Sequence, residues 1–137
     1  MLRYKLLHPQ ILEALGSAGH GAQILIADSN YPFSTGAHPA AKRVYLNLAP
    51  SLVGVPDLRV LVDAVPIESA QAIHPKSEDD PPIFNEYSQI MPNVPMTKLS
   101  RFPFYESAKS SDTGLVIATG EQRTWACILL TIGVVEA

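Results

Sequence analysis

A histidine and an aspartate flank a short apolar segment near the N-terminus, and both side chains can exchange protons or bind hydroxyl groups. His20 stands between Gly19 and Gly21, and Asp28 follows the segment Q-I-L-I-A. An unperturbed imidazole titrates near ~6.5, so it can act as acid or base at neutral pH. If the apolar segment is a strand, about five residues of extended chain separate the two groups, and direct contact is not guaranteed. A structural interpretation stays open, in which His20 ends a helix and Asp28 caps a turn.

Two later segments also carry polar groups that could serve a site. The first is Arg101-Phe102-Pro103-Phe104-Tyr105-Glu106, in which Arg101 stands just before a predicted helix. Phe102 and Tyr105 are typical of a core or an interface, and the helix dipole explains Glu106. The second is Thr119-Gly120-Glu121, followed by Trp125. Alone, this second segment indicates only a turn between strands.

Familiar cofactor and metal motifs are missing from the sequence. Gly16, Gly19 and Gly21 form G-x-x-G-x-G, but they follow a predicted helix and precede a strand, the reverse of the order in a dinucleotide-binding loop. The four histidines are well separated, and no His or Cys pair has metal-ligand spacing. We therefore expect no metal and no cofactor.

The elements that must position these residues alternate along the chain. Proline positions and apolar spacing predict helices that begin at Pro9, near Asp57, at Ile83 and at Pro103. Short apolar runs predict six strands, which are 23–27, 44–48, 69–73, 96–99, 114–119 and 126–132. The last two of them could form an antiparallel hairpin. Residues 77–82 are predicted to be an acidic loop. This order predicts an α/β fold, a single domain over residues 1–137 with a mixed sheet flanked by helices.

Composition limits the classes of partner. The chain has 137 residues, of which 47% are apolar and 17% charged, and its formal net charge is −3. The scattered lysines and arginines make nucleic-acid binding improbable, and no segment has the length of a membrane span or the pattern of a signal peptide. The single cysteine, Cys127, fits a cytoplasmic protein. The low charge indicates a homo-oligomer.

Taken together, the three segments resemble the family of ribose pyranases and L-fucose mutarotases from residue 1 to residue 135. The matching features, in chain order, are a helix ending in G-H, a strand ending in A-D with a following proline, a T-G-E turn, an I-L-L strand and G-V; here they are Gly19-His20, Ala27-Asp28 with Pro32, Thr119-Gly120-Glu121, Ile128-Leu129-Leu130 and Gly133-Val134. Arg101 makes the chain more similar to the fucose branch, since the ribose branch usually has a histidine there.

The resemblance implies a site and an assembly. His20 would be the catalytic proton donor or acceptor, with Asp28 and Arg101 binding the sugar. The family completes its site with a Tyr-x-Asn triplet, and this chain has Trp125-Ala126-Cys127 at those substrate-binding positions. The resemblance also implies a three-layer α/β/α fold and a decamer of two pentameric rings, with sites at subunit boundaries.

The implied chemistry suits these groups. Mutarotation of a monosaccharide needs a base at the anomeric hydroxyl and an acid at the ring oxygen, and it needs no cofactor. A carboxylate close to His20 would orient its ring and raise its basicity. Three alternatives stay open: D-ribose pyranase-type exchange of ring size, a non-catalytic sugar-binding or transport-accessory protein, and a structural oligomer without a ligand. Trp125 and Cys127 favour the non-catalytic alternative, because an indole only donates and a thiol bonds weakly.

Overall fold

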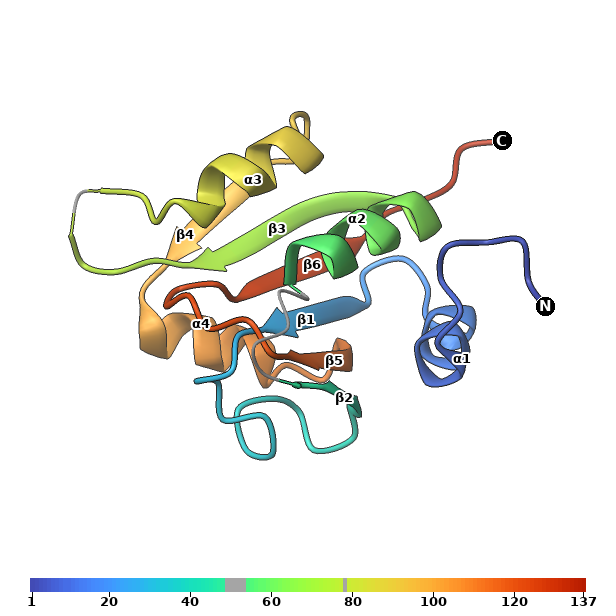
Figure 1. The fold of residues 1–137 in the computed structure, drawn as a ribbon, viewed down its shortest axis with the longest axis horizontal. Coiled ribbons are helices and arrows are strands. Elements are labelled where there is room, and N and C mark those ends of the chain that lie inside the picture. The colour runs from blue at the N-terminus through green and yellow to red at the C-terminus, as the bar shows by residue number, and fades with distance from the viewer. Residues whose placement is uncertain (49–53, 78) are drawn as a thin grey trace.

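The fold is a six-stranded mixed sheet covered by helices on both faces (Figure 1). The computed structural model describes residues 1–48, 54–77 and 79–137, so residue 78 of the predicted acidic loop lies outside the described residues. The elements in chain order are α1 (Pro9–Ser17), β1 (Gln23–Ala27), β2 (Lys42–Leu46), α2 (Gly54–Ala64), β3 (Ile67–Ile73), α3 (Ile83–Ile90), β4 (Met96–Leu99), α4 (Arg101–Ala108), β5 (Thr113–Thr119) and β6 (Ile128–Ile132).

The strand order in the sheet is β2-β5-β1-β6-β3-β4, and β6 alone runs antiparallel to its neighbours. The predicted hairpin of the last two strands is therefore wrong. Strand β1 lies between β5 and β6 and pairs with both of them. Because β1 is apolar on both faces, it gains more burial in the centre of the sheet than at an edge.

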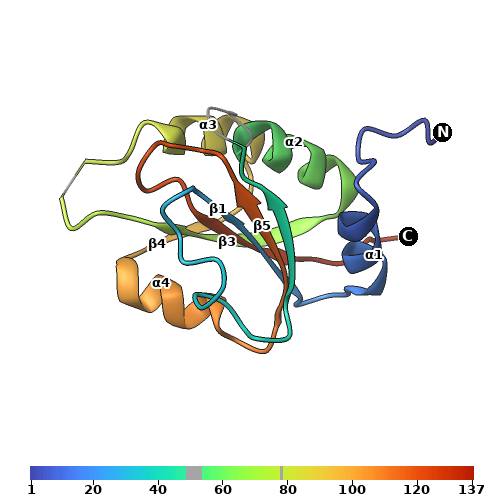
Figure 2. The same cartoon turned by 60° about the horizontal axis from the view of Figure 1, so that its bottom comes forward.

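The core has two halves, one on each face of the sheet. Ile24 and Ile26 of β1 pack into the half that holds buried residues of α1, α2 and α3, and Leu25 and Ala27 pack into the half that holds Phe104 of α4. This alternation follows from the two-residue period of a strand. Figure 2 shows α2 and α3 on one side of the sheet and α4 on the other. The predicted α/β fold with a mixed sheet and three layers is confirmed.

The topology brings together residues from distant parts of the chain. Strands β1 to β5 run in one direction, so their carboxyl ends share one edge of the sheet. Asp28 follows β1, Arg101 follows β4 as the first residue of α4, and Cys127 immediately precedes the oppositely directed β6. The crevice outside the carboxyl ends of strands is where open α/β sheets bind ligands. His20 precedes β1 and therefore lies at the opposite edge.

Within the described ranges, no helix has the length and apolar character needed to cross a membrane.

Candidate active site

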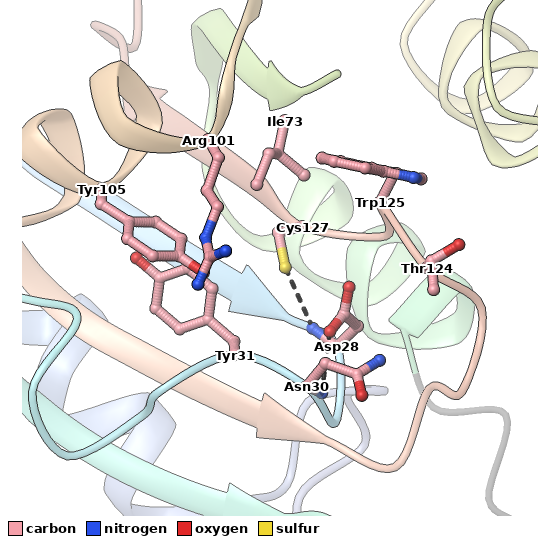
Figure 3. Close-up of a pocket in the computed structure, with 9 residues that line it drawn as sticks. All are labelled: Asp28, Asn30, Tyr31, Ile73, Arg101, Tyr105, Thr124, Trp125 and Cys127. Atoms are coloured by element: carbon pink, nitrogen blue, oxygen red, sulfur yellow. Dashed lines mark hydrogen bonds between the residues drawn. The ribbon is translucent and has the colours of Figure 1, made fainter. Parts of the chain in front are cut away.

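A pocket of about 260 Å³ opens at the carboxyl edge of the sheet. Figure 3 shows Arg101 on one side of it and Trp125 on the other, with Asp28 between them. The residues that line the pocket are Asp28, Asn30, Tyr31, Ile73, Arg101, Tyr105, Thr124, Trp125 and Cys127. A volume somewhat below the ~300–1,000 Å³ typical of drug-sized ligand sites suits a single small molecule.

Asp28 is buried and holds two loops of the pocket together. Its Oδ1 accepts a hydrogen bond from the backbone N–H of Asn30 at 2.9 Å, and its Oδ2 accepts one from Ala126 at 3.2 Å. Its own N–H donates to Sγ of Cys127 at 3.3 Å. Each carboxylate oxygen has two lone pairs, so acceptor capacity remains for a ligand hydroxyl.

Trp125 has a left-handed backbone, with φ of 66°. This conformation is rare for a bulky side chain and marks local strain, which persists only where the surroundings determine it. The hydrogen bond from Ala126 to Asp28 fixes the peptide that follows. As a result, the half-buried indole forms one wall of the pocket (Figure 3).

A buried glutamate stabilises the segment between β5 and β6 that carries Trp125. Glu121 is 1% exposed and forms an ion pair with Arg123, whose Nη2 lies 2.8 Å from Oε2. The Arg123 guanidinium lowers the pKa of Glu121 and also contacts Glu86 of α3 at 2.7 Å. The carbonyl of Glu121 accepts a hydrogen bond from Ser29, next to Asp28. The T-G-E segment is thus a connection between β5, the Asp28 loop and α3.

Arg101 lies over aromatic rings at the pocket wall. Its guanidinium carbon is 5.5 Å from the ring centroid of Phe102 and 5.5 Å from that of Tyr105. In the part of the chain that the structure describes, no carboxylate lies within 4.0 Å of this guanidinium. Its hydrogen-bond donors are therefore available to a ligand.

Two other lining groups stay uncharged at neutral pH. Burial raises the pKa of the Cys127 thiol, and the nearby Asp28 carboxylate raises it further. Burial also raises the pKa of Tyr31, whose hydroxyl donates to the carbonyl of Gly36 at 2.6 Å. Neither the thiol nor this phenol is a base for proton abstraction here.

His20 lies outside this pocket. It sits before β1, and the strand rises ~3.3 Å per residue over Gln23–Ala27, so roughly 16 Å of strand separate it from the Asp28 end. Its side chain is 60% exposed, and Nε2 lies 2.9 Å from Oε2 of Glu68 on β3. Within one chain, the predicted proton-transfer group and the predicted sugar-binding groups are on opposite edges of the sheet.

The other predicted residues fall at the pocket or directly behind it. Ala126 is buried and contributes its backbone N–H to Asp28 rather than a lining side chain. Sequence reasoning did not assign Asn30, Tyr105 or Thr124 to the site. Asn30 stands two residues after Asp28, and Tyr105 stands four after Arg101, one helical turn along α4. These spacings from Asp28 and Arg101 were the only sequence signal that could have placed Asn30 and Tyr105 in the site.

In the described ranges, no group of three or more His, Cys, Asp and Glu side chains is placed to hold a metal ion. The pocket combines a carboxylate, a guanidinium, an amide and three hydroxyl groups with aromatic walls. Such a set recognises a small molecule that carries several hydroxyl groups and an apolar face. The fold and pocket thus define an α/β protein with a pocket suited to a small hydroxylated molecule.

Comparison with known proteins gives the family. The model of the RbsD / FucU transport protein family matches residues 1–135, and the chain belongs to that family. It is 29% identical to the fucose mutarotase of Mus musculus, over 96% of this chain and 92% of the mouse protein. It is 28% identical to the D-ribose pyranase of Chloroflexus aggregans, over 98% of this chain and 99% of that protein.

A solved structure agrees with these relatives. The fucose mutarotase of Streptococcus pneumoniae, in complex with L-fucose, superposes with a TM-score of 0.84 at 29% identity, over 99% of this chain and 100% of that one. The predicted family is therefore confirmed.

Proposed function

We propose that this protein is a monosaccharide mutarotase, an isomerase that interconverts the cyclic forms of a reducing sugar, with L-fucose or a related sugar as substrate. The observation that carries the proposal is the pocket itself. It brings Asp28, Arg101 and Trp125 together from three separate segments, and these are positions at which the family resemblance places sugar-binding groups. The names of the relatives agree with this activity.

The proposed reaction moves protons and breaks one bond. A base takes the proton of the anomeric hydroxyl while an acid protonates the ring oxygen, so the bond between the anomeric carbon and the ring oxygen opens to an aldehyde. Rotation about the neighbouring carbon–carbon bond exposes the other face, and the reverse transfers close the ring. No atom is oxidised or reduced, so the reaction needs no cofactor.

Each pocket residue has a role in this scheme. The remaining lone pairs of the Asp28 carboxylate accept hydrogen bonds from sugar hydroxyls, and Arg101 donates to adjacent hydroxyl oxygens. The indole of Trp125 stacks on the apolar face of the pyranose ring. The family resemblance implies His20 as the proton carrier, and the Cys127 thiol and the Tyr31 phenol, which are held uncharged, do not take that role.

His20 can act at this pocket only from another copy of the chain. The length of β1 separates it from the pocket of its own chain, and its exposed ring is free to enter a neighbouring one. We therefore propose an assembly in which each pocket is completed by the His20 of a second copy, and the family resemblance favours a decamer of two pentameric rings. We also propose that residues 1–137 form one mutarotase domain and that the protein works in the cytoplasm.

Saturation-transfer NMR tests the activity. Irradiating the β-anomeric proton of L-fucose reduces the α-anomer signal, and the reduction increases with the exchange rate. We expect exchange well above the buffer rate with the protein present, and a panel with D-ribose and related sugars identifies the substrate. Exchange at the buffer rate for every sugar would exclude the proposed activity.

A non-catalytic sugar-binding function is the second candidate, and Cys127 favours it. Its sulfur accepts a hydrogen bond from the N–H of Asp28 and forms part of the pocket wall. Because a thiol is a weak donor, this position offers no strong hydrogen bond to a sugar. The same NMR samples decide between the two, because a binding protein broadens or shifts the sugar signals without accelerating exchange. D-ribose pyranase-type activity uses the same acid and base, and only exchange between furanose and pyranose signals would reveal it.

A further inference from the structure

A carboxylate is held against His20 at the edge of the sheet opposite the pocket. Oε2 of Glu68 lies 2.9 Å from Nε2 of His20, although 48 residues separate them in sequence. Both side chains are partly open to solvent, at 60% for His20 and 44% for Glu68. Among the described residues, Nδ1 of this imidazole has no hydrogen-bond partner, so this nitrogen is left for a molecule that approaches this edge.

The backbone around the pair is irregular in a way that brings the two residues together. In the pairing of β3 with β6, Ile67 lies opposite Ile132 and Ser69 opposite Thr131, so two steps along β3 match one along β6. Glu68 is the extra residue. Such irregularities redirect a side chain, and they are over-represented next to active sites.

Two glycines complete the arrangement. A Cβ at Gly133 would lie 3.1 Å from Cβ of Glu68, tighter than ordinary contact, so glycine leaves room for the redirected side chain. Gly21 has φ of 84°, which favours glycine, and its N–H donates to the carbonyl of Ile132 at 2.9 Å. This bond ties the residue after His20 to the end of β6, beside Glu68.

Stability alone is a weak reason for this construction. Ion pairs between partly exposed side chains contribute only ~0–1 kcal/mol. A carboxylate that accepts the Nε2–H of a histidine has a different use, because it fixes the ring orientation and keeps the proton on that nitrogen. The other nitrogen, Nδ1, then keeps its lone pair for a substrate proton.

We propose that Glu68 is a positioning residue for His20, holding the imidazole in the orientation and tautomer in which Nδ1 exchanges the proton of the sugar. The proposal rests on the mutarotase function proposed above. Glu68 does not touch the sugar. It acts through His20, so its loss lowers the rate of proton transfer and leaves sugar affinity nearly unchanged.

The test compares Glu68→Gln, Glu68→Leu and a matched control, Glu13→Gln. Glutamine keeps an acceptor oxygen without the charge, and leucine removes both. Glu13 is also an exposed, ion-paired glutamate, with Lys42 as its partner. We expect kcat for anomer exchange to fall ~10–100-fold in Glu68→Leu and less in Glu68→Gln, with KM within about twofold and the control unchanged.

A second readout does not depend on activity. The ¹⁵N resonances of the His20 ring, recorded without sugar, should shift in both Glu68 variants and not in Glu13→Gln. Unchanged ring resonances, an unchanged kcat, or a raised KM with unaltered kcat would each overturn the positioning role. If the unaltered protein exchanges no sugar at all, the mutarotase proposal fails and the role falls with it, whereas ring resonances that stay unchanged in an active enzyme reject the role alone.

Discussion

Trp125 is one of the residues at which this chain departs from its family resemblance, and its backbone is strained. A left-handed conformation costs a non-glycine residue roughly 1–2 kcal/mol. The structure keeps it because Asp28 binds the following peptide and the indole closes the pocket. The strain is thus tied to the shape of the site.

Two substitutions at Trp125 separate the backbone from the ring. Trp125→Ala and Trp125→Gly both remove the indole, but only glycine adopts φ of 66° without a steric cost. We expect the glycine variant to be more stable than the alanine variant by about 1 kcal/mol in urea unfolding. Both should bind sugar more weakly. An alanine variant at least as stable as the glycine variant would contradict the strained backbone.

At the scale of elements, the loop that leads into β6 depends on the ion pair of Glu121 and Arg123. The carboxylate is buried, and the arginine connects it to α3. Replacing Arg123 with methionine leaves a buried carboxylate without its charged partner. We expect a loss of roughly 1–3 kcal/mol in unfolding free energy at pH 7.

The pH dependence of this loss follows from the pKa of Glu121, which Arg123 lowers in the folded state. A depressed carboxyl pKa stabilises the fold above the ordinary value, and the contribution disappears as pH falls through the folded value. The difference between Arg123→Met and the unaltered protein should therefore shrink in urea titrations at acidic pH. An equal difference at pH 7 and at pH 3 would contradict the role of the charge.

Asp57, in the first turn of α2, has the opposite pH behaviour. Burial raises its pKa to about 7, and Oδ2 has no hydrogen-bond partner among the described residues. The unfolded chain loses this proton near 4 and the folded chain only near 7, so stability falls as pH rises between these values. We expect Asp57→Asn to raise the melting temperature more at pH 8 than at pH 4. A gain that does not depend on pH would contradict the buried carboxyl.

Local patterns predicted most of the elements, because each is set by neighbouring residues. The apolar run Gln23–Ala27 and the short strand Met96–Leu99 were predicted with the bounds found in the structure, and the helix predicted to begin at Ile83 begins there. Strand pairing is different. A turn-like segment separates the last two strands, and this pattern is typical of a hairpin. In the structure β1, which is buried on both faces, lies between these two strands instead.

The candidate site shows the same limit. Asp28, Arg101 and Cys127 were predicted as site residues and line one pocket, and each stands at the end of an element predicted from local pattern. Glu68 was missed because it lies on β3, 48 residues from His20, and only the folded sheet brings the two together. One glutamate in a strand of mixed polarity does not indicate a site residue. The separation of His20 from Asp28 was expected from the five-residue strand between them, whereas the strand order that brings Arg101 and Cys127 to the Asp28 end could not be foreseen.

At the scale of the whole molecule, the proposed site is divided between the two edges of the sheet. The pocket at the carboxyl edge has binding groups and no histidine, and the opposite edge has His20 with Glu68 and no pocket. In the proposed assembly, a contact that joins one edge to the other between copies completes the site. A head-to-tail contact gives a ring where the rotation from copy to copy closes, and the family resemblance implies such a ring.

Complementation between two inactive variants tests this account most directly. His20→Ala keeps an intact pocket, and Arg101→Ala keeps an intact His20, so neither homo-oligomer contains a complete site. The two chains are coexpressed with different tags, and tandem purification establishes that both are present in one assembly. Saturation-transfer NMR on the substrate sugar then measures anomer exchange.

The account predicts that each variant alone exchanges the sugar at a rate close to that of buffer. The mixed assembly should recover about one quarter of the activity per site of the unaltered protein, because one random pairing in four joins an intact pocket to an intact His20. Full activity of His20→Ala alone, or a mixed assembly as inactive as its two parents, would contradict a site shared between copies.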